Sequence, residues 1–244
     1  YTSVGDTGNI TDERTSDRQK IWRYNHDGSG KALFVEGIRN TEELRLRPGT
    51  DEVWGFAHGS DWFGREYGDT RRSLPITDLQ PPDELNHYRE GEFYGHPFIV
   101  GARLPRPEYA DKPFIHEMAR RTVPPAWEVG AHWAVNGWTF IDPALNAGNA
   151  MGQDAEGDIF FAAHGSWNSS EPVGYCVGRV LFDDDPINPG RPYGLQTIVS
   201  TLNERGQPIA RPVDVVQAPD GSLFWASDDP GAVYRLVRDE GAAR

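Results

Sequence analysis

The stretch Ile159-Phe160-Phe161-Ala162-Ala163-His164 decides the fold, because three other segments of the chain repeat its pattern. Each copy is a short apolar strand that ends at an acidic or histidine residue. The other copies are YTSVGD (1–6), VWGFAH (53–58) and LFWASD (223–228). When the copies are aligned without gaps, their sixth positions are Asp6, His58, His164 and Asp228. A tight-turn signal precedes three of them, at 49–51, 156–158 and 219–221.

Further strands flank these copies. An Arg- and Tyr-rich strand follows three of them, at 20–24, 177–182 and 232–236, and another strand precedes three of them, at 37–40, 136–140 and 211–215. The repeating unit is therefore strand, tight turn, strand, loop and strand, with a period of roughly fifty residues. Amphipathic helices do not alternate with the strands, which disfavours a parallel βαβ sheet. The pattern predicts an all-β protein, a β-propeller with about four blades in this chain.

The repeats predict one partial propeller domain over residues 1–244. A long, polar, Pro-rich insertion is expected at about 60–129, because the spacing between copies is widest there. Four blades would leave two open sheet edges, which natural proteins avoid. Residues 1–4 also read as the middle of a strand. We therefore expect the missing blades to come from upstream sequence or from another chain.

Composition excludes several classes of protein. The formal net charge of −13 is the opposite of what nucleic-acid binding usually requires. No run of 18 apolar residues is present, so no helix is expected to span a membrane. The single cysteine, Cys176, cannot form an internal disulfide. Two sequons, at Asn9 and Asn168, would permit glycosylation in a secreted eukaryotic protein.

Equivalent positions of a propeller repeat converge on one rim of the central channel. This predicts that Asp6, His58, His164 and Asp228 lie in one neighbourhood, joined by Arg39 and Arg211 from the preceding strands. Asp61 and Asp83-Glu84 are possible oxygen ligands for Ca²⁺, which prefers carboxylates and carbonyls. The sequence contains no phosphate-binding loop, metalloprotease helix or nucleophile elbow.

Several motifs, taken in order, resemble the soluble pyrroloquinoline-quinone (PQQ) dependent sugar dehydrogenases, including the aldose, sorbosone and fungal pyranose dehydrogenase groups. The motifs are VGDTGN (4–9), IWRYNHDG (21–28), GIRN (37–40), PPDELN (81–86), YGHP (94–97), GAH (130–132), HGSWN (164–168) and RPVDV (211–215). The resemblance implies a six-bladed propeller that oxidises a sugar or related polyol by hydride transfer to PQQ. In that family Ca²⁺ assists the reaction, and a histidine takes the proton of the sugar hydroxyl.

The same resemblance assigns roles to residues of this chain. It implies that Arg39 and Asn40 contact PQQ and that Arg211 pairs with a PQQ carboxylate. It places His132 and His164 near the cofactor. It implies a Ca²⁺-binding loop at His58, Gly59, Ser60 and Asp61, with backbone carbonyls as ligands. The catalytic histidine is expected in the strand before Tyr1, so this chain holds no catalytic residue. The implied partners are a sugar and an electron acceptor, and the implied location is extracellular or periplasmic.

Two departures from the family pattern keep other functions open. Thr41-Glu42-Glu43 follows the Arg-Asn pair, and acidic side chains there would repel an anionic cofactor. Cys176 stands where relatives often carry Lys. One alternative is a non-catalytic propeller module that binds a glycan or a protein partner in a larger assembly. A second alternative is a Ca²⁺-dependent hydrolase of the lactonase type.

Overall fold

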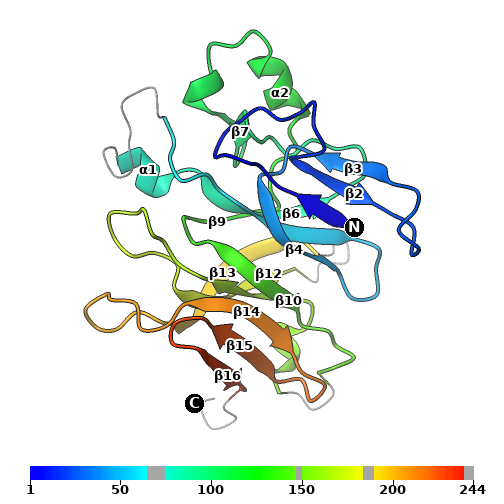
Figure 1. The fold of residues 1–244 in the computed structure, drawn as a ribbon. Coiled ribbons are helices and arrows are strands. Elements are labelled where there is room, and N and C mark those ends of the chain that lie inside the picture. Colours follow the sequence, from blue (N-terminus) through cyan, green and yellow to red (C-terminus); the bar gives the residue numbers. More distant parts are fainter. Residues whose placement is uncertain (65–74, 147–149, 184–189, 239–244) are drawn as a thin grey trace. The chain divides into compact units, whose positions relative to one another are not determined.

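The computed structural model describes residues 1–64, 75–146, 150–183 and 190–238 (Figure 1). It is all-β, with 40% strand and 8% helix, as the sequence predicted. Two compact units are present. Unit 1 comprises 1–46, 51–134 and 166–173, and unit 2 comprises 47–50, 135–165 and the chain from 174 onward. No helix of the described residues is long and apolar enough to cross a membrane.

Unit 1 contains two blade-like antiparallel sheets. The first has the order β1 (Thr2–Val4), β2 (Lys20–Arg23) and β3 (Ala32–Glu36). The second has the order β4 (Asn40–Leu46), β5 (Val53–His58), β6 (Pro82–Tyr88) and β9 (Trp127–Ala131). Strand β4 begins at Asn40, so residues 37–39 of the strand predicted at 37–40 precede it. Strands β1 to β3 and β4 to β6 follow one another in sequence as meanders, because antiparallel strands need only short connections, whereas β9 pairs with β6 after a long intervening stretch.

The stretch at about 60–129 adds smaller elements to unit 1. They are helix α1 (Pro75–Leu79), the pair β7 (Ile99–Val100) and β8 (Leu104–Pro105), a short 3-10 turn η2 (Pro107–Tyr109) and helix α2 (Ile115–Arg121). Strand β6 lies in the same stretch and forms the third strand of its sheet. Buried side chains of β7 and α2 form their own cluster with Phe93 and Phe98. This stretch therefore contributes packed structure as well as long connections.

Unit 2 repeats the meander twice. Strands β10 (Val135–Phe140), β11 (Ile159–Ala163), β12 (Cys176–Phe182) and β13 (Pro192–Ser200) form one sheet, with the 3-10 turn η3 (Gln153–Ala155) before β11. Strands β14 (Pro212–Gln217), β15 (Leu223–Ser227) and β16 (Ala232–Leu236) form the other. The repeat copies that became β5, β11 and β15 each lie second in their sheet. The strands predicted to precede β11 and β15 are β10 and β14.

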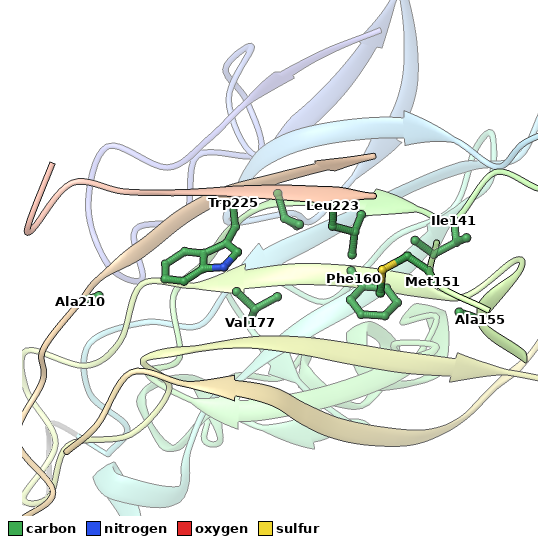
Figure 2. Packing of buried hydrophobic residues seen from close by; sticks show 9 residues of the cluster. Ile141, Met151, Ala155, Phe160, Val177, Ala210, Leu223 and Trp225 are labelled. Atoms are coloured by element: carbon green, nitrogen blue, oxygen red, sulfur yellow. The ribbon is translucent and has the colours of Figure 1, made fainter. Parts of the chain in front are cut away.

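Apolar side chains from both sheets of unit 2 form its core. Phe160 of β11 and Val177 of β12 meet Leu223 and Trp225 of β15, as Figure 2 shows. All five residues of β11 are buried, so this strand is covered on both faces. The continuous apolar run in the fold-deciding repeat is explained by this double burial.

Gly178 of β12 is required by the same packing. It pairs with Phe161 of β11, and a Cβ at position 178 would lie 2.2 Å from the Phe161 ring. Phe161 is fully buried, and side chains in protein interiors are closely packed. A side chain at position 178 therefore has to displace a core ring.

In unit 1, a carboxyl group is buried on β6. Glu84 pairs with Glu128 across β6 and β9, and its Oε1 accepts a hydrogen bond from the Gly101 amide at 2.6 Å. Burial of the carboxyl group raises the Glu84 pKa from 4.5 to about 8, and the charges of Glu128 and Asp83 act in the same direction. Glu84 is therefore protonated in the folded protein at neutral pH.

We expect Gly178→Ala to lower the free energy of unfolding by about 2 kcal/mol, because the added methyl group overpacks the core against Phe161. Urea unfolding of the purified protein measures this change. Gly231→Ala is the matched control, since Gly231 is exposed and its added Cβ would meet nothing within 4 Å. A Gly178 variant as stable as the control would contradict the packing.

We expect the stability of Glu84→Gln, relative to the parent protein, to rise by about 4 kcal/mol between pH 5 and pH 8.5. The folded protein holds the Glu84 proton up to about pH 8, whereas the unfolded chain releases it near 4.5. Its contribution to stability is therefore complete below pH 4.5 and lost once the pH has risen through 8. Unfolding curves across this range, with the exposed Glu117→Gln as control, test the shift. Parallel pH profiles of parent and Glu84→Gln would refute the burial of this carboxyl group.

Candidate functional site

The loop after β5 is the centre of a polar network in unit 1. The Gly59 amide donates to Asp83 Oδ1 at 2.8 Å, and the Gly59 carbonyl accepts from Arg39 Nη1 at 2.9 Å. A Cβ at position 59 would lie 2.6 Å from the Pro81 carbonyl oxygen and 2.9 Å from that of Pro82. Glycine is therefore required here for close approach of two backbone segments.

Arg39 joins this loop to the N-terminal segment. Its Nη2 donates to Asn9 Oδ1 at 2.7 Å, and its Nε donates to the Asn9 carbonyl at 3.3 Å. Burial lowers the Arg39 pKa, while the carboxylates of Asp61, Asp6 and Asp83 act to raise it. The guanidinium is thus a charged group that is held inside unit 1 by oxygen acceptors.

Asn40 and Asn9 complete the same network. Asn40 Oδ1 accepts from the Asp6 amide at 3.2 Å, and a Cβ at Gly5 would collide with that oxygen. Asn9 Nδ2 donates to Asp61 Oδ2 at 2.8 Å, while Asn9 Oδ1 accepts from the Asp61 amide at 3.0 Å. The predicted site residues Arg39, Asn40 and Gly59 therefore do lie together, with each of them bound to protein groups.

The sequence analysis missed a histidine–aspartate pair in unit 1. His96 Nε2 donates to Asp6 Oδ2 at 2.6 Å, and both side chains are withdrawn from solvent. Burial lowers the pKa of His96, and this outweighs the raising effect of Asp6. Burial acts to raise the pKa of Asp6, but hydrogen bonds from His96 and the Gly8 amide lower it overall. The pair is a neutral imidazole beside a carboxylate. His96 belongs to the YGHP motif at 94–97. Nothing in the sequence indicated that it would pair with Asp6, because the two residues are 90 positions apart.

A small cavity lies beside this network. Its volume is about 20 Å³, which is room for about one water molecule, and Arg39, His58, Glu84, His96 and Arg106 are among its lining residues. A more open, polar hollow of about 470 Å³ lies between β1 and β4. Glu42 and Glu43, the acidic residues that depart from the family pattern, line this hollow. The closed cavity is far too small for a sugar or a quinone.

Unit 2 carries a second polar cluster. Arg211 Nη2 donates to His164 Nδ1 at 3.0 Å, and His164 Nε2 donates to Asp228 Oδ2 at 2.9 Å. The hydrogen bond from His164 lowers the Asp228 pKa. The Arg211 Nε is buried and has no hydrogen-bond partner among the residues that the structure describes. Because buried N–H groups are nearly always paired, this donor indicates an acceptor from a bound molecule or water.

Four predicted site residues have other placements. His132 has a left-handed backbone, with φ at 63°, and its Nε2 donates to the Thr77 carbonyl of α1 at 2.5 Å. It therefore anchors α1 in unit 1. His58 Nδ1 lies 3.9 Å from Glu42, and Ser60 Oγ donates to the Trp62 carbonyl. The fourth, Asp61, is held by Asn9 as described above.

The predicted convergence of four repeat positions is a separate matter. Asp6 and His58 lie in unit 1, whereas His164 and Asp228 lie in unit 2, so their convergence stays a prediction.

Both sequon asparagines are engaged in the fold. Asn9 uses its amide nitrogen and oxygen on Asp61 and Arg39, and Asn168 Nδ2 donates to the Asp61 carbonyl. Asn168 is also buried. A glycan on either nitrogen would break these contacts, so the folded protein disfavours glycosylation at both positions.

Cys176, which opens β12, is buried in unit 2. Burial raises the pKa of its thiol to about 11, so the side chain is neutral at physiological pH. It cannot supply the positive charge of the Lys that the family resemblance implies at this position. Within the described ranges, no group of three or more His, Cys, Asp or Glu side chains could hold a metal ion.

Solved structures with a similar fold include sugar dehydrogenases. The PQQ domain of pyranose dehydrogenase from Coprinopsis cinerea is 19% identical, with a TM-score of 0.73 over 97% of this chain and 66% of that one. A calcium structure of a carbohydrate-active enzyme of family AA12 from Trichoderma reesei is 18% identical, with a TM-score of 0.75 over 97% of this chain and 64% of that one. The soluble aldose sugar dehydrogenase of Escherichia coli, in its apo form, is 18% identical, with a TM-score of 0.59 over 97% and 60% of the two chains. At these identities the likeness shows the fold.

Sequence comparison gives the family. An uncharacterized protein of Borreliella burgdorferi is 29% identical over 211 residues, which cover 85% of this chain and 49% of the relative. This chain thus spans about half of that protein and about two thirds of the first solved structures. A family model described as TrAA12-like matches residues 116–239, just over half of the chain. The matched region includes β9 to β16, with the Arg211 cluster. The chain belongs to the TrAA12-like family.

Proposed function

We propose that the protein containing this chain is an oxidoreductase that acts on a sugar or a related polyol, with PQQ as hydride acceptor. Family membership and the fold support the class of reaction, since the solved relatives include a pyranose dehydrogenase and an aldose sugar dehydrogenase. The observation that carries the proposal is the unpaired, buried Nε of Arg211 beside His164 and Asp228.

The Arg211 cluster fits an anionic cofactor. PQQ carries three carboxylates, and a guanidinium binds carboxylates through charge-assisted, often paired, hydrogen bonds. The Nε–H of Arg211 has no acceptor among the described residues, and the guanidinium lies over the Tyr175 ring, with 5.9 Å between Cζ and the ring centroid. Arg211 would hold a carboxylate of PQQ, and His164 would fix the orientation of Arg211. When bound, PQQ supplies the hydride acceptor of the reaction.

His164 is a positioning residue in this proposal. Its Nδ1 accepts a hydrogen bond from Arg211, and its Nε2 donates one to Asp228. Both ring nitrogens are occupied, so His164 has no free lone pair with which to take a proton from a substrate. We therefore assign proton removal to the histidine that the family resemblance implies upstream of this chain.

Calcium is the second group that the resemblance implies. The loop from His58 to Asp61 does not fit it, because the Gly59 carbonyl, an implied ligand, already accepts a hydrogen bond from the guanidinium of Arg39. The proposed function therefore assigns no step of the reaction to Ca²⁺ at this loop. The implied sugar, electron acceptor, six-bladed closure and location outside the cytoplasm form part of the same proposal.

A non-catalytic module is the second candidate function, and two observations favour it. Cys176 is a neutral thiol where relatives often carry Lys, and Glu42 and Glu43 line the open hollow of unit 1. Both features reduce the attraction of the protein for an anionic cofactor. Such a module would bind a glycan or a protein partner through the propeller surface.

The direct test is to mix the full-length protein with PQQ and to measure aldose-dependent reduction of a redox dye. The assay is run with Ca²⁺ and with a chelator. We expect saturable PQQ binding and turnover that depends on the sugar. Absence of both PQQ binding and turnover would instead favour the non-catalytic module.

We expect Arg211→Met to weaken PQQ binding by roughly ten- to a hundredfold, because a charge-assisted hydrogen bond to a carboxylate is lost. Calorimetric titration with PQQ measures the affinity. Arg235→Met is the matched control: Arg235 is half exposed and forms a surface ion pair with Asp220, so PQQ affinity should be unchanged. Equal affinities of the Arg211 variant and the control would remove Arg211 from the site.

A further inference from the structure

We infer that the guanidinium of Arg39 replaces a metal ion at the loop from residue 58 to 62, so that this loop is held by the protein's own cation and does not bind Ca²⁺. The inference concerns the metal and the stability of unit 1. It does not depend on the redox activity proposed above.

Arg39 binds the oxygen atoms that a metal ion at this loop would need. Its three nitrogens donate to the Gly59 carbonyl at 2.9 Å, to Asn9 Oδ1 at 2.7 Å and to the Asn9 carbonyl at 3.3 Å. Ca²⁺ requires six to eight oxygen ligands at about 2.3–2.6 Å. An ion on the Gly59 carbonyl would therefore share this oxygen with a guanidinium nitrogen and meet its positive charge at close range.

A second arginine takes the acceptors at the far end of the loop. Arg106 is almost fully buried, and its Nη1 donates to Ser60 Oγ at 2.7 Å while its Nη2 donates to the Trp62 carbonyl at 2.9 Å. Glu108 balances its charge at 3.1 Å. The loop thus contacts two guanidinium groups, one at Gly59 and one at Ser60 and Trp62.

The acidic residue of the loop is also satisfied without metal. Asp61 Oδ2 accepts from Asn9 Nδ2, the Asp61 amide donates to Asn9 Oδ1, and the Asp61 carbonyl accepts from Asn168. The charges of Asp61, Asp6, Asp83 and Glu42 stabilise the cationic form of Arg39. The acidic groups that would attract Ca²⁺ are therefore balanced by an arginine that is covalently part of the chain.

Removal of Arg39 should uncover an oxygen-rich vacancy. The Gly59 carbonyl, the Asn9 carbonyl and Asn9 Oδ1 would lose their donor, and the Asp61 carboxylate is held beside them through Asn9. These are the ligand types that Ca²⁺ prefers. A chain without the Arg39 charge should therefore gain a dependence on Ca²⁺ that the natural chain does not have.

The test measures thermal unfolding of the full-length protein in millimolar CaCl₂ and in EGTA. We expect the unfolding temperature of the natural protein to be the same in both. Arg39→Met should unfold several degrees lower in EGTA, because buried carboxylates lose their counter-charge, and Ca²⁺ should restore part of the loss. Arg23→Met, at an exposed ion pair with Glu90, is the matched control and should show no Ca²⁺ effect.

Two results would overturn the inference. One is a saturable stabilisation of the natural protein by Ca²⁺ that Asp61→Asn abolishes, since this would place a metal at the loop despite Arg39. The other is a folded Arg39→Met protein that Ca²⁺ does not stabilise. Calorimetric titration of the natural protein with Ca²⁺ decides the first point even if Arg39→Met does not fold. Failure of the PQQ assay would leave each of these outcomes unchanged.

Discussion

A partly buried guanidinium has to be surrounded by oxygen acceptors, and unit 1 is organised around that constraint at Arg39. The side chain collects acceptors from the segment after β1 and from the loop after β5, so it fixes two segments far apart in sequence. The carboxylates of Asp61, Asp6 and Asp83 stabilise its cationic form, and Asp6 also accepts a hydrogen bond from His96. One desolvated charge thus fixes the positions of the oxygen acceptors that surround it.

Among the described residues, Arg39 and Arg211 differ in how completely their guanidinium nitrogens are paired. Every nitrogen of Arg39 has an acceptor, whereas Arg211 retains a buried donor without one. A buried cation with a protein acceptor at each of its nitrogens serves structure, because it holds together the segments that supply these acceptors. An unpaired buried donor costs free energy until a ligand or water pairs it. This contrast is why the proposed cofactor contact is placed at Arg211 and the structural role at Arg39.

Antiparallel meanders explain why this fold can carry such clusters. Each strand turns back beside its predecessor, so strand ends and turns of successive strands recur at the sheet margins. Asn40 begins β4 and His58 ends β5, and the two residues are direct partners in the sheet. His164 directly follows β11, and Asp228 directly follows β15. The apolar side chains in the middle of the strands form the core. The polar residues at the strand ends form the two polar clusters.

The sequence by itself determined the all-β class, the four repeat copies and most flanking strands, because strand periodicity and turn residues act over a few neighbouring positions. It also identified Arg39, Gly59 and Arg211 as residues of polar sites. It could not show that Arg39 binds the predicted metal-ligand carbonyl, or that His96 pairs with Asp6. Those contacts join residues distant along the chain, and they depend on which acceptors remain near a charge once the backbone is packed. Tertiary structure alone decided that the guanidinium of Arg39 meets the carbonyl of Gly59.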